Sequence, residues 1–324
     1  MLSSLWIPIF ALVIGLVFLV WSADRFLSGA AATATNAGVS KMMIGLTVVS
    51  LGTSAPEILV ALAAALDGNP LLAIGNAVGS NIANIGLVLG ITAIIAPLPF
   101  SGETLRTELP WLFGATALAL LLLFDQNLSR LDGLLLLAGL ALILFGLLQR
   151  QSTHPDDISE AISQELEELP EMPMRPALFW LVFGLVILLC SANLLVWAAT
   201  EIAIALGVSE LIIGLTIVAI GTSLPELAAT VGSALKGHTD IAVGNVVGSN
   251  ILNILAVMSV PALVHPIGID AAVFWRDCGM MVALTLLLGL FAYGMNSRAI
   301  ITRFEGIVLI LSWVGYNCML YIQA

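Results

Sequence analysis

Two glutamates lie within stretches that are otherwise apolar enough to cross a lipid bilayer. Glu57 ends the sequence GTSAPE, and Glu226 ends the sequence GTSLPE. A carboxylate in the hydrocarbon region is costly, so each glutamate is first interpreted as part of a functional site. Each motif also supplies side-chain hydroxyls, and carboxylates with neutral oxygens are ligands for hard cations. The two motifs therefore predict a cation site.

The prolines in these motifs predict broken helices. Pro56 and Pro225 lack an N–H group, and each ring clashes with the carbonyl four residues earlier. Within a membrane, a broken helix is tolerated only inside the protein or beside a water-filled cavity. The freed carbonyls are then available as ligands, and the dipole of the new half-helix favours an ionised glutamate. The hydroxyl candidates are Thr53, Ser54, Thr222 and Ser223.

The helix after each motif carries a stripe of Asn, Ser and Asn at intervals of four residues. Side chains at this interval share one helical face. The stripe could line the cation site, or it could serve only for hydrogen bonding between helices. Neighbouring glycines would let another helix approach this face closely. The stripe residues are Asn76, Ser80 and Asn84 in the first copy and Asn245, Ser249 and Asn253 in the second.

The ligand types narrow the choice of ion. No His or Cys occurs in these stretches, which disfavours Zn²⁺ and copper. Two carboxylates with many neutral oxygens suit Ca²⁺, which takes about 6–8 oxygen ligands, whereas Mg²⁺ prefers to keep its waters. The same pair of charges could instead hold several Na⁺ ions. A structural kink alone explains one motif but poorly explains two that both carry Pro and Glu.

The composition requires a membrane protein to position these residues. The chain has 324 residues, of which 60% are hydrophobic and only 10% are charged, and its mean hydropathy is +1.10. A soluble domain carries about 25% charged residues. Apolar runs of helical length predict ten transmembrane helices, with the second and seventh broken at the motifs. The predicted helices span 5–32, 42–66, 71–95, 109–124, 131–148, 177–204, 210–235, 240–264, 271–294 and 304–322.

The two halves of the chain are copies of each other. A shift of 169 residues aligns 45–90 with 214–259 without a gap, and 23 of these 46 positions are identical. A unit with five membrane crossings places its second copy in the opposite orientation. The fold class is therefore predicted to be an all-α polytopic membrane protein with two inverted five-helix repeats, as in many secondary transporters. The repeats would occupy 1–149 and 177–324.

The basic residues predict the orientation in the membrane. If the N-terminus is outside, Lys41, Arg106, Arg150, Arg175, Lys236, Arg298 and Arg303 fall in inward loops, with Arg25 near an inner helix end. Only Arg130 and Arg276 then face outward, which follows the positive-inside rule. This arrangement predicts a cell (inner or plasma) membrane protein with both termini outside. Residues 150–176 would form a cytoplasmic linker, which holds seven of the 21 acidic residues and is interpreted as solvated.

The two motifs and the stripes after them resemble the alpha-repeats of the cation/calcium antiporter superfamily, in particular its sodium/calcium exchanger branch. The resemblance implies that Glu57 and Glu226 are shared ligands of Ca²⁺ and Na⁺, and that Thr53, Ser54, Thr222 and Ser223 complete the sites. It also implies that Ser80, Asn84, Ser249 and Asn253 line the same cavity. Backbone carbonyls of Ser50 and Ala219 would contribute as well. Some members carry Asp at one of the two Asn84 and Asn253 positions, whereas this chain has Asn at both.

The resemblance implies a secondary active transporter in which inward Na⁺ flow expels Ca²⁺ by alternating access. The first and sixth helices would slide across the rest, and the substrates would be Ca²⁺ and Na⁺, with no cofactor and no obligatory protein partner. An antiporter of the same fold coupled to H⁺ or K⁺ is the first alternative. An intramembrane hydrolase using the two glutamates is a distant one, because the chain has no HExxH-type motif. A channel is disfavoured by the two-fold arrangement of charges.

Overall fold

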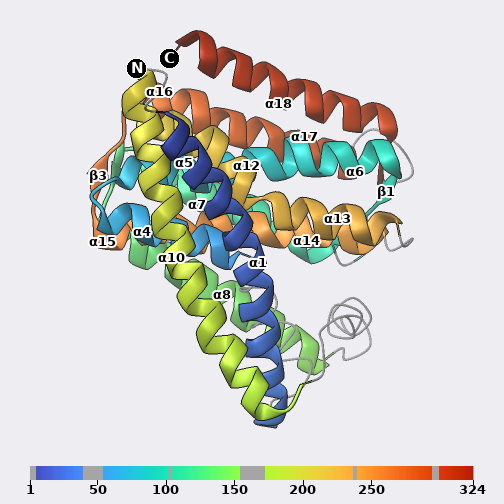
Figure 1. Ribbon diagram of the computed structural model, residues 1–324. Coiled ribbons are helices and arrows are strands. Elements are labelled where there is room, and N and C mark those ends of the chain that lie inside the picture. The colour runs from blue at the N-terminus through green and yellow to red at the C-terminus, as the bar shows by residue number, and fades with distance from the viewer. Residues whose placement is uncertain are drawn as a thin grey trace.

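The structure is a computed structural model that describes residues 5–38, 54–100, 102, 104–153, 172–235, 239–293 and 299–323. It is a bundle of α-helices with short π-helical turns and two small pairs of strands (Figure 1). Within the described residues, seven helices are long and apolar enough to cross a membrane, or eight if one bent pair counts as a span. The prediction of a helical membrane protein is thus confirmed. The number ten remains a prediction, because residues 42–53 of the second predicted span are outside the described residues.

The first half of the chain follows the predicted order of helices. The long helix α1 spans Trp6–Asn36, and α4 (Ala55–Leu66) follows the first motif. The third predicted helix runs without a break from Pro70 to Ile95, but a π-helical turn lies in its middle. The remaining elements are α5 (Pro70–Ala83), η3 (Asn84–Leu89), α6 (Gly90–Ile95), β1 (Leu98–Pro99), η4 (Thr104–Glu108), α7 (Leu109–Leu123), β2 (Asn127–Leu128) and α8 (Arg130–Thr153).

The second half repeats this order after the long helix α10 (Met174–Leu206). Because α8 continues to Thr153 and α10 begins at Met174, helices enter the predicted linker 150–176 from both ends. Helix α10 stops at Gly207, whose φ of +70° gives the left-handed turn that commonly ends helices. The other elements are α11 (Glu210–Ile213), η5 (Gly214–Val218), α12 (Ala219–Thr222), α13 (Leu224–Leu235), α14 (Thr239–Leu252), η6 (Asn253–Val257), α15 (Ser259–Val264), β3 (Ile267–Gly268), α16 (Ala271–Val273), η7 (Phe274–Cys278), α17 (Gly279–Tyr293), β4 (Ile300–Ile301) and α18 (Arg303–Gln323).

The predicted break in the second motif is present. Helical residues Glu210–Thr222 and Leu224–Leu235 are bent by 41° at Ser223. Pro225 follows in the first turn of α13, where its missing N–H costs nothing within the helix it begins. In the first motif, residues 39–53 before the equivalent Ser54 are outside the described residues, but α4 likewise begins with a proline in its first turn. Both glutamates therefore stand in the first turn of a half-helix.

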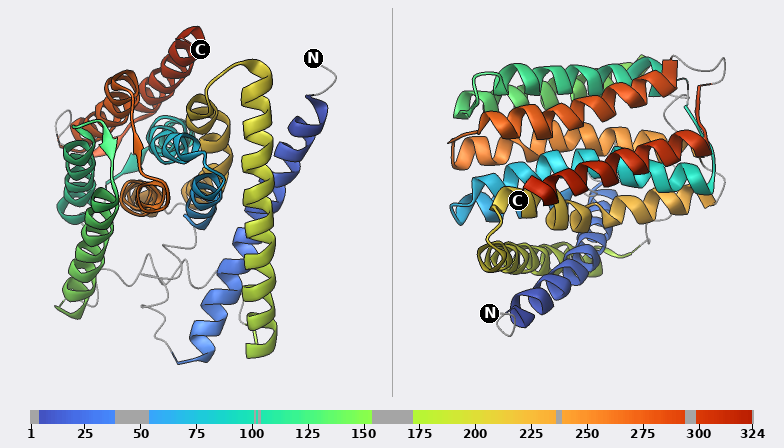
Figure 2. Two further views of the ribbon diagram at one scale, coloured as in Figure 1. Left: turned by 90° about the vertical axis from the view of Figure 1, so that its left-hand side faces the viewer. Right: turned by 90° about the horizontal axis from the view of Figure 1, so that it is seen from above.

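Helices α1 and α10 form an antiparallel pair along one edge of the molecule (Figures 1 and 2). Glycines allow their backbones to touch, since a Cβ atom on Gly29 would lie 2.3 Å from the backbone nitrogen of Leu181. Likewise, a Cβ atom on Gly184 would lie 2.7 Å from the nitrogen of Phe26. The Asn36 side-chain amide donates to the Met172 carbonyl at 3.0 Å, which ties the ends of the pair.

Two short antiparallel strand pairs connect the halves at opposite ends of the bundle. Strand β1 pairs with β4, and β2 pairs with β3. Figure 1 places β1 at one end and β3 at the other. Each of the last helices of the two halves then begins with a side-chain cap. Asp132 accepts from the Ser129 backbone N–H at 2.7 Å, and Glu305 accepts from that of Thr302 at 2.6 Å.

Candidate cation-binding site

The structure buries both motif glutamates at the starts of half-helices. The side chains of Glu57 on α4 and Glu226 on α13 are 0% and 1% exposed. Among the described residues, none of their four carboxylate oxygens has a hydrogen-bond partner. A buried carboxylate without a partner is unfavourable, and a bound cation would remove this penalty.

A network of polar side chains joins the two halves beside Glu57. The Asn76 amide on α5 donates to the backbone carbonyl of Glu57 at 3.3 Å. Its carbonyl oxygen accepts from the Thr222 hydroxyl on α12 at 3.1 Å. The Thr222 hydroxyl also lies 3.4 Å from the hydroxyl of Ser80. Residues from both motifs and from the first stripe therefore meet at one place.

The stripe residues Asn84 and Asn253 each open a π-helical turn, at the starts of η3 and η6. Single π-helical turns within α-helices often occur at functional sites, because they displace side chains and carbonyls from the regular helical pattern. Both asparagines are fully buried, and neither their amide oxygens nor their amide nitrogens have a partner in the part of the chain that the structure describes. Helix α5 packs against η6, and α14 packs against η3, so the two turns lie beside the opposite stripe helices.

Unpaired buried polar atoms concentrate around this region. Native proteins rarely leave such atoms without a partner, so a cluster of them indicates a bound ligand or ion. The hydroxyls of Ser54, Ser223 and Ser249 are buried and unpaired like the amides of Asn84 and Asn253. Together with the two carboxylates, these groups supply oxygen atoms of the type that binds hard cations. Among the described residues, no group of three or more His, Cys, Asp or Glu side chains could hold a metal.

Glycines set the distance between the two halves at the site. A Cβ atom on Gly75 would lie 2.5 Å from the Leu211 carbonyl oxygen, and one on Gly79 would lie 2.6 Å from that of Leu215. A Cβ atom on Gly214 would lie 2.5 Å from the Leu72 carbonyl. Helix α5 therefore contacts α11 and η5 backbone to backbone. This close approach brings Asn76 and Ser80 within reach of Thr222.

Most of the sequence-predicted site residues are buried in this part of the fold. Thr53 lies outside the described residues, as does Ser50. Polar contacts that include the Asn76 side chain join Glu57, Ser80 and Thr222. Six others are buried in the same helices without a side-chain hydrogen bond in the described part of the chain: Ser54, Ser223, Glu226, Asn84, Ser249 and Asn253.

Three further buried polar residues were not predicted as ligands. Asn81 donates to the Ala77 carbonyl at 2.8 Å, but its amide oxygen is unpaired. Neither polar atom of the Asn250 amide has a partner. Thr230 is fully buried one turn beyond Glu226, and its hydroxyl is also unpaired. The spacing of four residues from Glu226 was the sequence signal for Thr230, because it places both side chains on one face.

Comparison with known proteins gives a consistent result over the whole chain. The family described as sodium/calcium exchanger protein matches residues 7–149 and 176–322. The chain is 47% identical to CaxA of Alkalimonas amylolytica, which is named as an antiporter, over 97% of this chain and 98% of that protein. It is 40% identical to the inner membrane protein YrbG of Escherichia coli (strain K12), over 96% and 95% of the two chains.

A solved structure is similar over nearly the same length. The fold matches that of the sodium-calcium exchanger NCX_Mj with a TM-score of 0.62 and 32% sequence identity. The match covers 96% of this chain and 97% of that one. The similarity therefore extends across both halves, including both glutamate motifs and both stripes.

Proposed function

Because the chain belongs to the sodium/calcium exchanger protein family, we propose that it exchanges Na⁺ for Ca²⁺ across the membrane by alternating access. Its relatives are transporters rather than enzymes, which removes the hydrolase alternative. One observation carries the choice of substrate class. Two buried carboxylates, one from each half, have no hydrogen-bond partner among the described residues, and unpaired buried hydroxyls and amides occur on the same and on neighbouring helices.

The ligand set suits both proposed substrates. Two carboxylates balance the charge of one Ca²⁺, and the neutral oxygens supply the rest of its about 6–8 ligands. The same oxygens could hold Na⁺ ions in place of Ca²⁺, so that occupancy by one ion excludes the other. We propose that Glu57 and Glu226 bind both ions, with Thr53, Ser54, Thr222, Ser223, Ser80, Ser249, Asn84 and Asn253 as further ligands. No cofactor takes part.

We further propose that the fold consists of ten membrane helices in two inverted repeats, 1–149 and 177–324. Several structural pairs support this proposal. Turns η3 and η6 begin at equivalent residues, Asn84 and Asn253, and η4 and η7 precede equivalent helices. The strand pairs β1–β4 and β2–β3 exchange partners between the halves and lie at opposite ends of the bundle. Inverted repeats are typical of secondary transporters.

The orientation follows from the same arrangement. Helix α1 starts and α18 finishes toward the same end of the bundle (Figure 1), which supports placing both termini on one side. By the positive-inside rule that side is the outside, and the linker 150–176 is cytoplasmic. We place the protein in the cell membrane, as the name of YrbG indicates for that relative. The pair α1 and α10 would slide across the rest to change access.

The proposed coupling is tested by transport in proteoliposomes. Uptake of ⁴⁵Ca²⁺ into Na⁺-loaded vesicles is expected to depend on the outward Na⁺ gradient, because Na⁺ and Ca²⁺ compete for one site. The Na⁺, K⁺ and pH gradients are varied one at a time. When the Na⁺ gradient is varied, the K⁺ concentration and the pH are equal on both sides of the membrane. If ⁴⁵Ca²⁺ uptake does not depend on the Na⁺ gradient but depends on a pH or K⁺ gradient, Na⁺ exchange is rejected and the H⁺- or K⁺-coupled alternative is selected.

Replacing Thr222 by Val tests the oxygen shell beyond the carboxylates. The substitution keeps the side-chain shape but removes the hydroxyl that donates to Asn76 and faces Ser80. We expect a Ca²⁺ affinity about 10-fold weaker, since leaving a buried polar group unpaired costs about 1–3 kcal/mol. Equilibrium ⁴⁵Ca²⁺ binding to the purified variant measures this affinity.

Thr216→Val is the matched control on the same broken helix. The Thr216 hydroxyl donates only to the Ile212 carbonyl of its own helix, at 2.7 Å. We expect this variant to bind Ca²⁺ with less than about a 2-fold change. Equal affinities for Thr222→Val and the unmodified protein would contradict a ligand role for this hydroxyl.

A further inference from the structure

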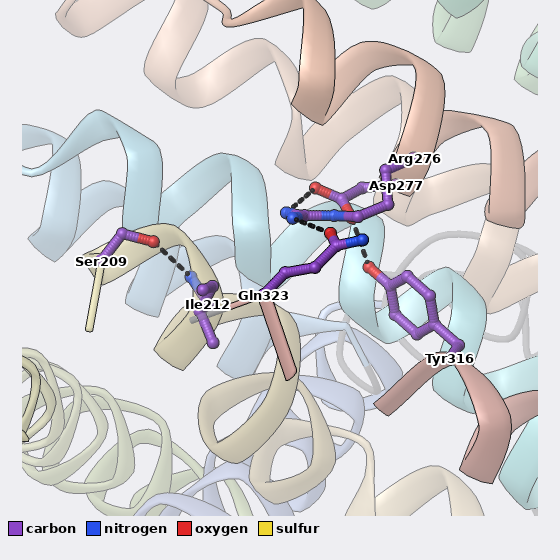
Figure 3. A network of polar contacts seen from close by, with 6 residues as sticks. All are labelled: Ser209, Ile212, Arg276, Asp277, Tyr316 and Gln323. Carbon is purple, nitrogen blue, oxygen red and sulfur yellow. Dashed lines mark hydrogen bonds and ion pairs between the residues drawn. The ribbon is translucent and has the colours of Figure 1, made fainter. Parts of the chain in front are cut away.

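A buried carboxylate outside the cation site ties η7 to α18. Asp277 in η7 is fully buried and receives two hydrogen bonds from the neighbouring Arg276 guanidinium, at 2.7 and 3.0 Å. It also accepts from the hydroxyl of Tyr316 on α18 at 2.8 Å. Arg276 in turn donates to the Gln323 side chain at 3.1 Å, so α18 is held at two residues, Tyr316 and Gln323 (Figure 3).

Helix α18 lies directly on the π-helical turn that carries Asn84. A Cβ atom on Gly86 would lie 2.7 Å from the Cβ of Trp313, so the Trp313 side chain starts against the η3 backbone. One turn further, a Cβ atom on Gly90 would lie 2.7 Å from Ile310. Trp313 and Tyr316 are three residues apart and share a face of α18. The Asp277–Tyr316 bond is therefore adjacent to the contact that covers η3.

The opposite end of α18 is held independently. Ile301 in β4 pairs with Leu98 in β1, and Glu305 caps the helix through the Thr302 backbone at 2.6 Å. A Cβ atom on Gly306 would lie 2.9 Å from the Gly90 carbonyl. Both ends of α18 are thus held, and glycine contacts lie between them. If the Tyr316 end were released, a shift of α18 along its axis would press on η3.

We propose that Asp277 and Tyr316 are positioning residues for the cation site, acting through Trp313 on η3 and so on Asn84. This inference rests on the proposed function. The Asn84 amide has no protein partner in the described structure, so the η3 backbone alone sets its direction. The Asp277–Tyr316 bond fixes the register of α18 in which Trp313 covers Gly86. Releasing this bond would let η3 relax toward a regular helix and turn Asn84 away from the carboxylates.

The first half carries other residue types at the equivalent positions. The residue equivalent to Asp277 is Glu108 in η4, which accepts from the Thr104 hydroxyl on its own turn at 2.7 Å. The residue equivalent to Arg276 is Thr107, which carries no charge. The positioning role of Asp277 and Tyr316 therefore applies to Asn84 and not to Asn253.

Tyr316→Phe is the sharpest test, because it removes one hydroxyl and leaves the ring packed. We expect the half-saturating Ca²⁺ concentration to rise about 3- to 10-fold. We also expect faster amide hydrogen exchange in the peptide covering residues 84–90. Ser312→Ala is the control, since the Ser312 hydroxyl bonds only to the Val308 carbonyl within α18, at 2.8 Å. It should change neither quantity.

A double-mutant cycle separates positioning from simple stabilisation. In an Asn84→Ala background, Tyr316→Phe should have no further effect on Ca²⁺ binding, because the group that it positions is gone. An undiminished effect in that background would overturn the inference. The inference would also be overturned if the Tyr316→Phe protein had a lower melting temperature but unchanged Ca²⁺ binding and unchanged amide hydrogen exchange at residues 84–90.

Asp277→Asn provides a second variant, with the same expected changes. This substitution leaves the Arg276 charge without its carboxylate, so the variant is compared with Tyr316→Phe only if the protein folds. If the unmodified protein binds no Ca²⁺, the proposed function fails. The amide hydrogen exchange of residues 84–90 then still decides whether Tyr316 controls η3, since that measurement needs no bound ion.

Discussion

Replacing Glu57 or Glu226 by Gln is expected to abolish Ca²⁺ exchange while leaving the protein folded in the membrane. Gln keeps the shape of the side chain but removes one of the two charges that face the ion. At an effective dielectric constant near 20, one such charge contributes on the order of 4 kcal/mol. This corresponds to about a 1000-fold loss of Ca²⁺ affinity. ⁴⁵Ca²⁺ uptake into Na⁺-loaded proteoliposomes measures the loss.

The same substitutions should not destabilise the ion-free protein. Both carboxylates are buried without a hydrogen-bond partner among the described residues, so neutralising one removes the cost of keeping an unpaired charge away from water. The melting temperature without Ca²⁺ should therefore stay the same or rise, whereas the stabilisation by added Ca²⁺ should disappear. A fall in melting temperature would indicate a structural role for the carboxylates.

Glu305→Gln is the matched control for this experiment. Glu305 is also a buried acid, but it caps α18 through the Thr302 backbone. Gln can accept the same hydrogen bond, so capping survives. Transport by this variant should remain near that of the unmodified protein. Retained Ca²⁺ transport in both Glu57→Gln and Glu226→Gln would show that the carboxylates do not hold the ion.

Enlarging Gly79 to Leu is expected to disrupt the contact between the two halves. A Cβ atom there would already lie 2.6 Å from the Leu215 carbonyl and 2.7 Å from the Ala219 Cβ. A larger side chain must separate α5 from η5, at a cost of about 3 kcal/mol or more. We expect a lower melting temperature, a reduced yield of folded protein and no measurable Ca²⁺ binding. Gly79→Ala should show a smaller loss of the same kind.

Gly114→Leu is the control for added volume in a membrane helix. Gly114 lies on the exposed face of α7, and no described atom comes within 4 Å of a Cβ built there. This variant should melt at or above the temperature of the unmodified protein, because Gly is a weak helix former. If Gly79→Leu also melts normally and binds Ca²⁺, the backbone contact does not set the site.

The sequence predicted the helical class and the placement of the two motifs because these depend on local patterns. Apolar runs of helical length marked the spans, and Pro225 marked the bend now seen at Ser223. The duplication then related Glu57 to Glu226 without any knowledge of their distance. The predicted helix 177–204 proved longer, at Met174–Leu206, because Pro173 starts the helix and Gly207 ends it.

Other features depend on contacts between distant segments and could not be predicted. Asn76 was recognised as part of a stripe, but its link to Thr222, 146 residues away, needs the packing of α5 on α12. The π-helical turns at Asn84 and Asn253 have no signature in the local sequence. Asp277 was a detectable signal, as an acid in an apolar run, yet its partner Tyr316 could not be identified from spacing.

Anomalous diffraction from crystals soaked with Sr²⁺, a heavier substitute for Ca²⁺, tests the central claim most directly. We predict one strong peak in contact with carboxylate oxygens of both Glu57 and Glu226, at about the 2.3–2.6 Å of Ca²⁺ ligands. The peak should weaken as Na⁺ is raised. A peak at another place, or none between the two carboxylates, would contradict the proposed site.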